Sequence, residues 1–184
     1  MARNNVRTGN DAGLMSVLVA RFSAIGDVAM TVPVVYSACR CYPDVRFTVV
    51  TRPAMTSIFV NAPANLTVVG ADVKNDYRGP SGMYRLVREL VRDYRIDAFV
   101  DLHDVIRTQL MGLFCRLRGI PVARINKGRA RKRALTRRNG KDLVPLTPVH
   151  RLYADVFTHL GITRRRSFIS LFGPEGADPS LTAP

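Results

Sequence analysis

Short apolar runs alternate with amphipathic segments along most of the chain, from residue 15 to about residue 160. The runs are nearly continuous in apolar and often β-branched side chains, a pattern typical of strands in a parallel sheet that is covered on both faces. They predict strands at SVLVA (16–20), FTVV (47–50), LTVV (66–69), AFVDL (98–102) and IPVARI (120–125).

The segments between the predicted strands have the period of α-helices. Apolar residues recur at helical spacing over 83–94, and Arg85, Arg88, Arg92 and Arg95 lie off this stripe. The same pattern recurs over 149–160, where Gly161 marks the end of the helix. We also expect a helix at 105–118, with Asp104 as its N-terminal cap. Strands alternating with helices predict an α/β fold, a Rossmann-like, doubly wound parallel sheet.

We expect this domain to cover residues 15–163. The first 14 residues are polar and lack the apolar core of a signal peptide, so we expect a disordered extension, with Met15 as an alternative start. The end of the chain, 164–184, is rich in Gly and Pro and predicts a linker or frayed tail without a second domain.

The segment FSAIGDVAMTVPVV places Asp27 between the first predicted strand and the first predicted helix. Pro33 interrupts this helix: either GDVAM forms a short turn and Thr31 caps a new helix, or one helix kinks. A carboxylate at a helix N-terminus stays ionised and is able to accept a proton from an incoming hydroxyl group. Asp27 therefore has two interpretations, a general base or a residue that only caps the helix.

Polar side chains follow four of the predicted strands. Because ligands bind outside the carboxyl ends of strands in open parallel sheets, these side chains mark a candidate site. They are Arg21, Ser23, Asp27, Thr51, Arg52, Asp101, His103, Asp104, Arg107, Asn126, Lys127 and Arg129. A dinucleotide fingerprint is excluded, because the first junction carries one glycine where three are needed, and Asp27 would repel a pyrophosphate.

The chain carries 28 Lys and Arg against 14 Asp and Glu, a net charge of +14, which favours anionic partners. Residues 116–141 alone hold eleven cations and no acid, and form either a solvated face or an anion-binding surface. No aromatic residue interleaves with these charges, which argues against nucleic acid as the partner. The three cysteines form no CxxC pair, and neither they nor the three histidines have the spacing of a metal site.

The stretch VLVARFSAIGDVAMTVPVV resembles the opening of the ADP-heptose–lipopolysaccharide heptosyltransferase family, with its signature S-x-x-G-D-V-hydrophobic-x-T-x-P. In this chain the signature residues are Ser23, Gly26, Asp27, Val28, Thr31 and Pro33. Segments 97–120 and 125–138 and the YADVF of 153–157 are also similar to the family, so that the resemblance extends from about Met15 to Gly161. Family members often carry Arg before the Tyr of the last helix, where this chain has Leu152.

The resemblance implies the N-terminal, acceptor-binding half of a GT-B glycosyltransferase. Asp27 would act as the general base of an inverting transfer from ADP-heptose, which the C-terminal half would bind, to the lipid A–inner core of lipopolysaccharide. We expect acceptor contacts from Ser23, Gly26, Arg52, His103, Lys127 and Arg129. The reaction would need no metal or other cofactor, and the protein would be cytoplasmic, on the inner face of the inner membrane, without nucleic acid as a partner. The alternative is a non-catalytic basic module that binds acidic lipid or nucleic acid.

Overall fold

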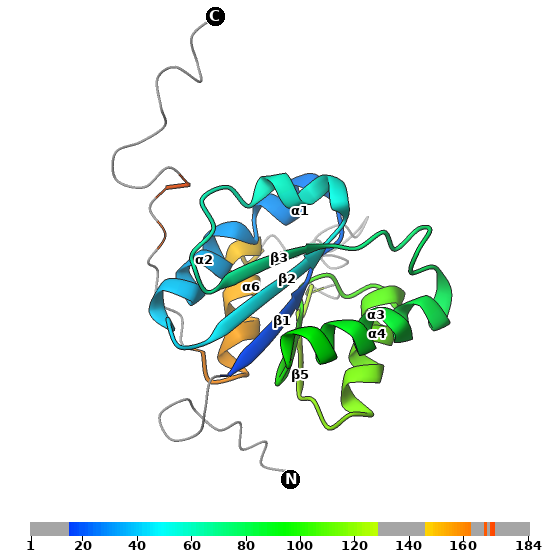
Figure 1. Cartoon of the computed structure of the whole chain (residues 1–184). Helices are drawn as coiled ribbons and strands as arrows, with labels where there is room; N and C mark the ends of the chain where they lie inside the picture. Colours follow the sequence, from blue (N-terminus) through cyan, green and yellow to red (C-terminus); the bar gives the residue numbers. More distant parts are fainter. Residues whose placement is uncertain (1–14, 129–145, 163–167, 169, 172–184) are drawn as a thin grey trace, which may run out of the picture.

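The computed structural model describes residues 15–128, 146–162, 168 and 170–171, and within them the five predicted strands form one parallel sheet. The strands lie in the order β3-β2-β1-β4-β5 (Figure 1). The elements are β1 (Ser16–Ala20), α1 (Ile25–Ala29), α2 (Val32–Cys41), β2 (Arg46–Thr51), the 3₁₀ helix η1 (Pro53–Ile58), β3 (Leu66–Gly70), α3 (Gly79–Tyr94), β4 (Ala98–Asp101), α4 (Ile106–Arg116), β5 (Val122–Arg124) and α6 (Val149–Thr158). The predicted α/β, Rossmann-like doubly wound fold is confirmed.

The centre of the sheet is β1, and all five of its residues are buried. Val17 pairs in parallel register with Phe47 of β2 on one side and with Ala98 of β4 on the other. A strand paired on both edges and covered on both faces has no position for an exposed polar side chain, which explains its continuous apolar sequence.

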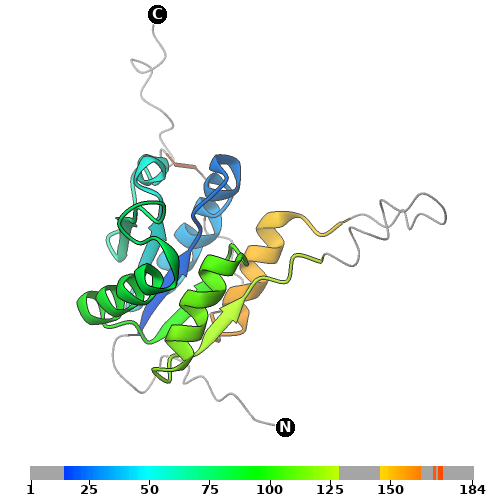
Figure 2. The same ribbon diagram turned by 90° about the vertical axis from the view of Figure 1, so that its right-hand side faces the viewer.

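Helices cover both faces of the sheet, α2 and α6 on one and α3 and α4 on the other (Figures 1 and 2). The first layer buries Tyr36 and Tyr153 against the sheet, and the second buries Met83 and Met111. Alternate residues of β1 point to opposite layers, so that each layer has its own core cluster.

The interruption at Pro33 separates two helices, as the first of the two alternatives predicted. Helix α1 ends after five residues, and α2 begins after Thr31, with Pro33 in its first turn, where proline needs no hydrogen-bond donor. The Thr31 hydroxyl does not cap α2 but donates to the carbonyl of Val28 at 2.6 Å. Asp27 consequently lies in a short helix of its own, just beyond the carboxyl end of the central strand β1.

The prediction that Asp104 caps α4 is wrong. The N-cap is Val105, whose N–H donates to Thr108 Oγ1 at 3.1 Å. Asp104 has a left-handed backbone (φ 48°), and its carboxylate instead accepts from Gln109 Nε2 at 2.9 Å. The helix starts one residue later than predicted, so that Asp104 lies in the loop before the N-cap.

Several sequence predictions fall outside the described residues. These are the extension at 1–14, most of the tail at 164–184, and Arg129 with the rest of the cationic run beyond Gly128. Among the helices that are described, none combines the length and the apolar character needed to cross a membrane.

Candidate active site

The order of the strands has one topological switch point, between β1 and β4, and the space outside the ends of these two strands is here called the crevice. Strands β2 and β3 lie on one side of β1, and strands β4 and β5 lie on the other side. The carboxyl ends of β1 and β4 are thus neighbours from which the chain departs in opposite directions, the position where ligands bind in open α/β sheets. Arg21 follows β1 directly, and His103 follows β4 by two residues.

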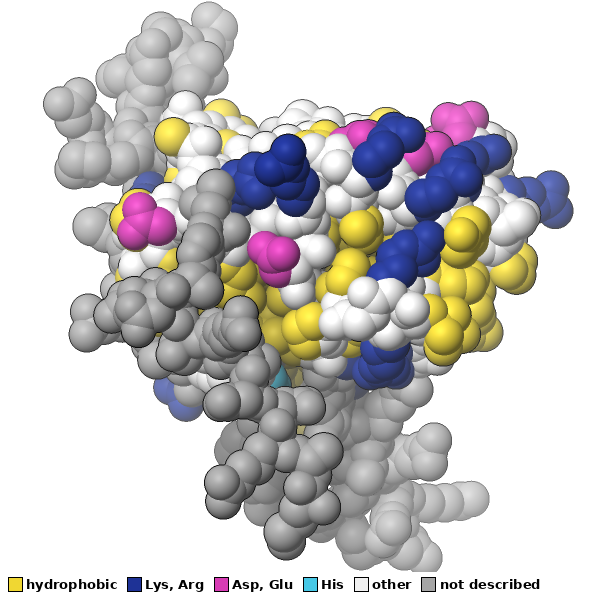
Figure 3. All heavy atoms as spheres, turned by 60° about the horizontal axis from the view of Figure 1, so that its bottom comes forward, with side chains coloured by type: hydrophobic (Ala, Val, Ile, Leu, Met, Phe, Trp, Pro, Cys, Tyr) yellow, Lys and Arg dark blue, Asp and Glu magenta, His cyan; other side chains and the backbone are white. Residues whose placement is uncertain are grey.

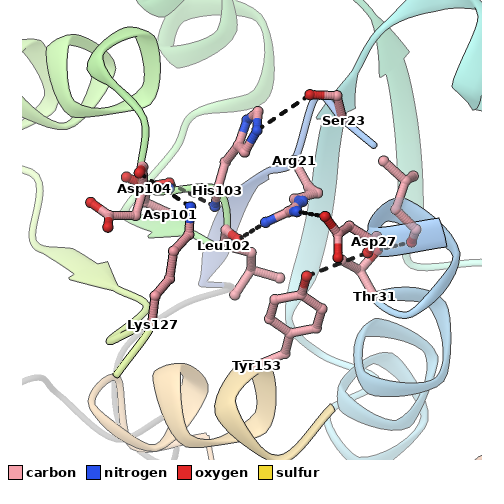
Figure 4. A network of polar contacts seen from close by, with 11 residues as sticks. Arg21, Ser23, Asp27, Thr31, Asp101, Leu102, His103, Asp104, Lys127 and Tyr153 are labelled. Carbon is pink, nitrogen blue, oxygen red and sulfur yellow. Dashed lines mark hydrogen bonds and ion pairs between the residues drawn. The ribbon is translucent and has the colours of Figure 1, made fainter. Parts of the chain in front are cut away.

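Arg21 lies between the loop after β4 and helix α1 (Figure 4). Its side chain is buried, its Nη1 donates to the carbonyl oxygen of Leu102 at 2.6 Å, and its Nη2 forms an ion pair with Asp27. The guanidinium also lies 5.8 Å from the centre of the Tyr153 ring. Arg21 therefore joins the loops after β1 and β4, and it faces α6 as well.

Asp27 lies in the first turn of α1, and its side chain points toward Arg21 (Figure 4). Its side chain is 46% exposed, although its partner Arg21 is almost fully buried. The hydroxyl of Tyr153 donates to the backbone oxygen of Asp27 at 3.5 Å. The carboxylate is consequently held from one side by a rigid cation and remains open to a ligand on the other.

His103 faces Asp27 across the crevice and is also buried (Figure 4). Its Nε2 lies 3.4 Å from the hydroxyl oxygen of Ser23, and its Nδ1 has no hydrogen-bond partner among the described residues. Burial, together with the positive charges of Arg21 and Lys127, lowers the pKa of His103 to about 4. At neutral pH the imidazole is therefore neutral, and it is able either to donate a hydrogen bond to a ligand hydroxyl or to accept one from it.

Asp101, which the sequence placed among the candidate site residues, is fully buried and supports the loop behind them. Its Oδ1 accepts the N–H groups of His103 at 2.9 Å and of Asp104 at 2.8 Å. Its Oδ2 forms an ion pair with Arg124 at 3.3 Å. Asp101 fixes the position of His103 without reaching the crevice itself.

Lys127 lies on the far side of this loop and donates from Nζ to the carbonyl oxygen of Asp104 at 3.3 Å. It also lines a groove of about 300 Å³ between β5 and α6. The groove is lined in addition by Arg124, Asn126, Gly128, Leu146, Thr147, Leu152, Asp155, Val156 and His159. Cationic, polar and apolar side chains thus extend the site from Lys127 along α6.

The structure brings together four of the predicted site residues, Ser23, Asp27, His103 and Lys127, through Arg21 and the loop after β4. Gly26 lies in α1 beside Asp27, and a Cβ there would meet no atom within 4 Å, so that the backbone is accessible from solvent. Arg52 follows β2 as the N-cap of η1, and η1 contacts α1, the helix that carries Asp27.

Sequence reasoning missed the contributions of Tyr153 and of the Leu102 carbonyl. Tyr153 fits the apolar stripe of its helix, and the stripe alone gave no sign that its hydroxyl reaches a residue 126 positions away. In the described part of the chain, no three His, Cys, Asp or Glu side chains gather in a way that could hold a metal ion.

No protein-family model and no curated protein sequence matches the chain. Solved structures are similar to it in fold. A family 9 glycosyltransferase from Veillonella parvula superposes with a TM-score of 0.60 and 19% identity, over 85% of this chain and 45% of the other. The E. coli heptosyltransferase WaaC, in complex with ADP-2-deoxy-2-fluoro heptose, gives a TM-score of 0.56 and 17% identity, over 84% of this chain and 51% of its own.

The chain thus spans about half the length of these two structures. At such low identity the similarity concerns the fold alone. The chain is a Rossmann-like α/β domain with the fold of one half of a GT-B glycosyltransferase.

Proposed function

We propose that the chain is the acceptor-binding, N-terminal half of an inverting glycosyltransferase, with Asp27 as its general base. The observation that carries the proposal is the half-exposed Asp27 carboxylate, held by Arg21 at the topological switch point of the sheet. The proposed donor is ADP-heptose, bound mainly by a second domain, and the proposed acceptor is the anionic lipid A–inner core, at the cytoplasmic face of the inner membrane. The fold shared with glycosyltransferase structures supports this assignment.

In the proposed reaction an acceptor hydroxyl binds between Asp27 and His103. Asp27 takes the proton as the hydroxyl oxygen attacks the anomeric carbon of the donor sugar, and the nucleoside diphosphate leaves from the opposite face. The new glycosidic bond therefore has the inverted configuration. Neutral His103 and Ser23 would orient the acceptor by hydrogen bonds, since both lie at the crevice.

The surrounding cations suit an acidic acceptor. Lys127 and Arg107 raise the positive potential at His103, and both contribute to its low pKa. An acceptor bearing carboxylates or phosphates would be attracted to this edge of the sheet. We propose Lys127, Arg52 and Arg129 as the residues that bind these anionic groups.

The test is sugar transfer from ADP-heptose to a deacylated inner-core acceptor. It is measured for the chain alone and for a chimera in which the nucleotide-sugar-binding half of a heptosyltransferase is joined to the chain. Asp27→Asn keeps the size and hydrogen-bonding shape of the side chain, and we expect it to lower the turnover number about 10²–10⁴-fold. A rate within about tenfold of the parent would remove Asp27 from the role of base. Asp93→Asn is the matched control, because Asp93 of α3 is an aspartate as exposed as Asp27 that pairs with Arg92 outside the candidate site.

A second candidate function is a non-catalytic module that binds acidic lipid or other polyanions. The observation in its favour is the run of eleven cations without an acid over 116–141. Such a module would bind heparin, oligonucleotides and acidic vesicles alike, with affinity that falls steeply as salt is raised. Binding of the inner-core oligosaccharide that persists at high salt, without binding of generic polyanions, would exclude it.

A further inference from the structure

Helix α4 has apolar residues on two opposite sides. The residues that face the sheet are Thr108, Met111, Gly112 and Cys115. The residues on the opposite side, here named the outer stripe, are Ile106, Leu110, Leu113 and Leu117; of these, Leu110 is half-buried and also packs against the core. The spacing of four, three and four residues keeps the outer stripe on one line along the helix surface.

The outer stripe is largely open to solvent. Ile106 is 79% exposed, Leu113 46% and Leu117 74%. Tyr84 of the neighbouring α3 is also exposed, and it packs edge-on against Phe114, with ring centres 5.4 Å apart, so that the apolar surface continues from α4 to α3. Contiguous apolar surface of this kind marks a site of interaction with a protein or a membrane.

Cations surround this surface. Arg116 of α4 and Arg85 and Arg88 of α3 are exposed, and Arg118 lies 4.9 Å from the centre of the Tyr84 ring. Helix α4 contains no acidic residue. Figure 3, where the side of the domain that carries α3 and α4 lies to the right, shows apolar side chains interleaved with Lys and Arg.

Two occupants fit an exposed apolar stripe on a helix, a second copy of the chain and a membrane. A second copy would place arginines against arginines, and α4 is only about 17 Å long, too short to supply the roughly 800 Å² per partner of a stable interface. An anionic lipid surface complements the cations and receives the leucines among its acyl chains. The charge and the length of the helix both favour the membrane.

We propose that the outer stripe of α4, together with Tyr84 of α3, docks into the interfacial region of a membrane that contains anionic lipid. The side chains of the outer stripe enter the boundary between headgroups and acyl chains, and the arginines contact the lipid phosphates. The proposal does not depend on sugar transfer. It does place the membrane beside the crevice, because Ile106 follows His103 by three residues.

The test is flotation of the full chain with vesicles of phosphatidylcholine, with and without phosphatidylglycerol, at low and high salt. We expect binding to the anionic vesicles that persists in part at high salt, because the apolar contribution is not screened. Leu113→Gln with Leu117→Gln should weaken it about tenfold for each leucine, and Arg116→Glu about fivefold. Val60→Gln is the control, since it removes an equally exposed apolar side chain from the loop after η1 and should leave binding unchanged.

Two results would overturn the proposal. One is equal binding of the parent and the double leucine variant at every salt concentration, which would assign vesicle binding to the cationic run alone. The other is a dimer of the parent, seen by light scattering, that the double variant disperses, which would assign the outer stripe to a second copy. If the double variant loses its far-UV circular dichroism, Ile106→Gln alone serves the same comparison, because this side chain is the most exposed of the outer stripe.

Discussion

Arg21 and Asp27 form one ion pair, but the structure predicts that they contribute differently to stability and to function. Arg21 is buried and joins two loops, whereas Asp27 is half exposed and water can replace its partner. We expect Arg21→Met to destabilise the fold and Asp27→Asn to leave its stability nearly unchanged. Methionine keeps most of the volume of the arginine stem and removes every donor.

The magnitudes follow from the two contacts of the guanidinium. Its hydrogen bond to the buried Leu102 carbonyl is charge-assisted, and bonds of this kind contribute about 1.5–3 kcal/mol. The ion pair with Asp27 has a partner open to solvent, and such pairs contribute only about 0.2–1 kcal/mol. Arg21→Met should therefore lower the free energy of unfolding by about 2–3 kcal/mol, and Asp27→Asn by less than about 1 kcal/mol.

Urea unfolding followed by far-UV circular dichroism measures both changes, since the chain has no tryptophan for a fluorescence assay. The double variant completes a cycle, and its coupling free energy should stay below about 1 kcal/mol. In the proposed transfer assay the order reverses, with the larger loss of rate for Asp27→Asn.

A loss of several kcal/mol in Asp27→Asn, with strong coupling to Arg21→Met, would refute this reasoning. It would mean that Asp27 serves chiefly to neutralise a buried arginine. The carboxylate would then be a structural group, and the assignment of Asp27 as the base would lose its physical support.

Three further predictions concern other parts of the domain. The pKa of His103 is lowered to about 4 in the folded chain, so between about pH 4 and 6.5 the unfolded chain binds more protons than the folded one. The free energy of unfolding should therefore fall as the pH drops through this window. In urea titrations His103→Gln should make this decrease smaller. Burial raises the pKa of Cys39 and of Cys115 to about 12. A thiol reagent at neutral pH should therefore modify one cysteine of the native chain, half-buried Cys41, and all three cysteines in urea. A reaction of the native chain that persists in Cys41→Ser would contradict this. A Cβ at Gly82 would lie 2.3 Å from backbone carbon of the loop before α3, so Gly82→Ala should lower the free energy of unfolding by about 3 kcal/mol, and an unchanged urea midpoint would show that this contact relaxes freely.

The strands and helices were predictable because their sequence patterns are local. The predicted run at 16–20 coincides with β1, and the alternation of periods was enough for the fold class. The ends of elements were less predictable. The last predicted strand, 120–125, shortens to Val122–Arg124, because the chain pairs with β4 over only three residues.

The cap of α4 was mispredicted for a reason of the same kind. Asp104 has a side chain suited to capping, but the loop after β4 turns through a left-handed residue before the helix starts. Asp101, already buried at the end of β4, accepts the loop N–H groups of His103 and Asp104. Capping preferences alone cannot distinguish Asp101 from Asp104, because the position of β4 in the sheet decides which of the two aspartates bonds to the loop.

The candidate site shows what strand order adds to sequence. The list of polar residues at strand ends included Arg52 as readily as His103, since both follow a strand closely. Both β2 and β4 lie beside β1, but the switch point lies between β1 and β4, whereas β2 is followed by η1. At the switch point Arg21 donates to the carbonyl of Leu102, the residue before His103, across 81 positions of the sequence. The signature around Asp27 locates one wall of the site, and the strand order determines which of the remaining polar residues form the other wall.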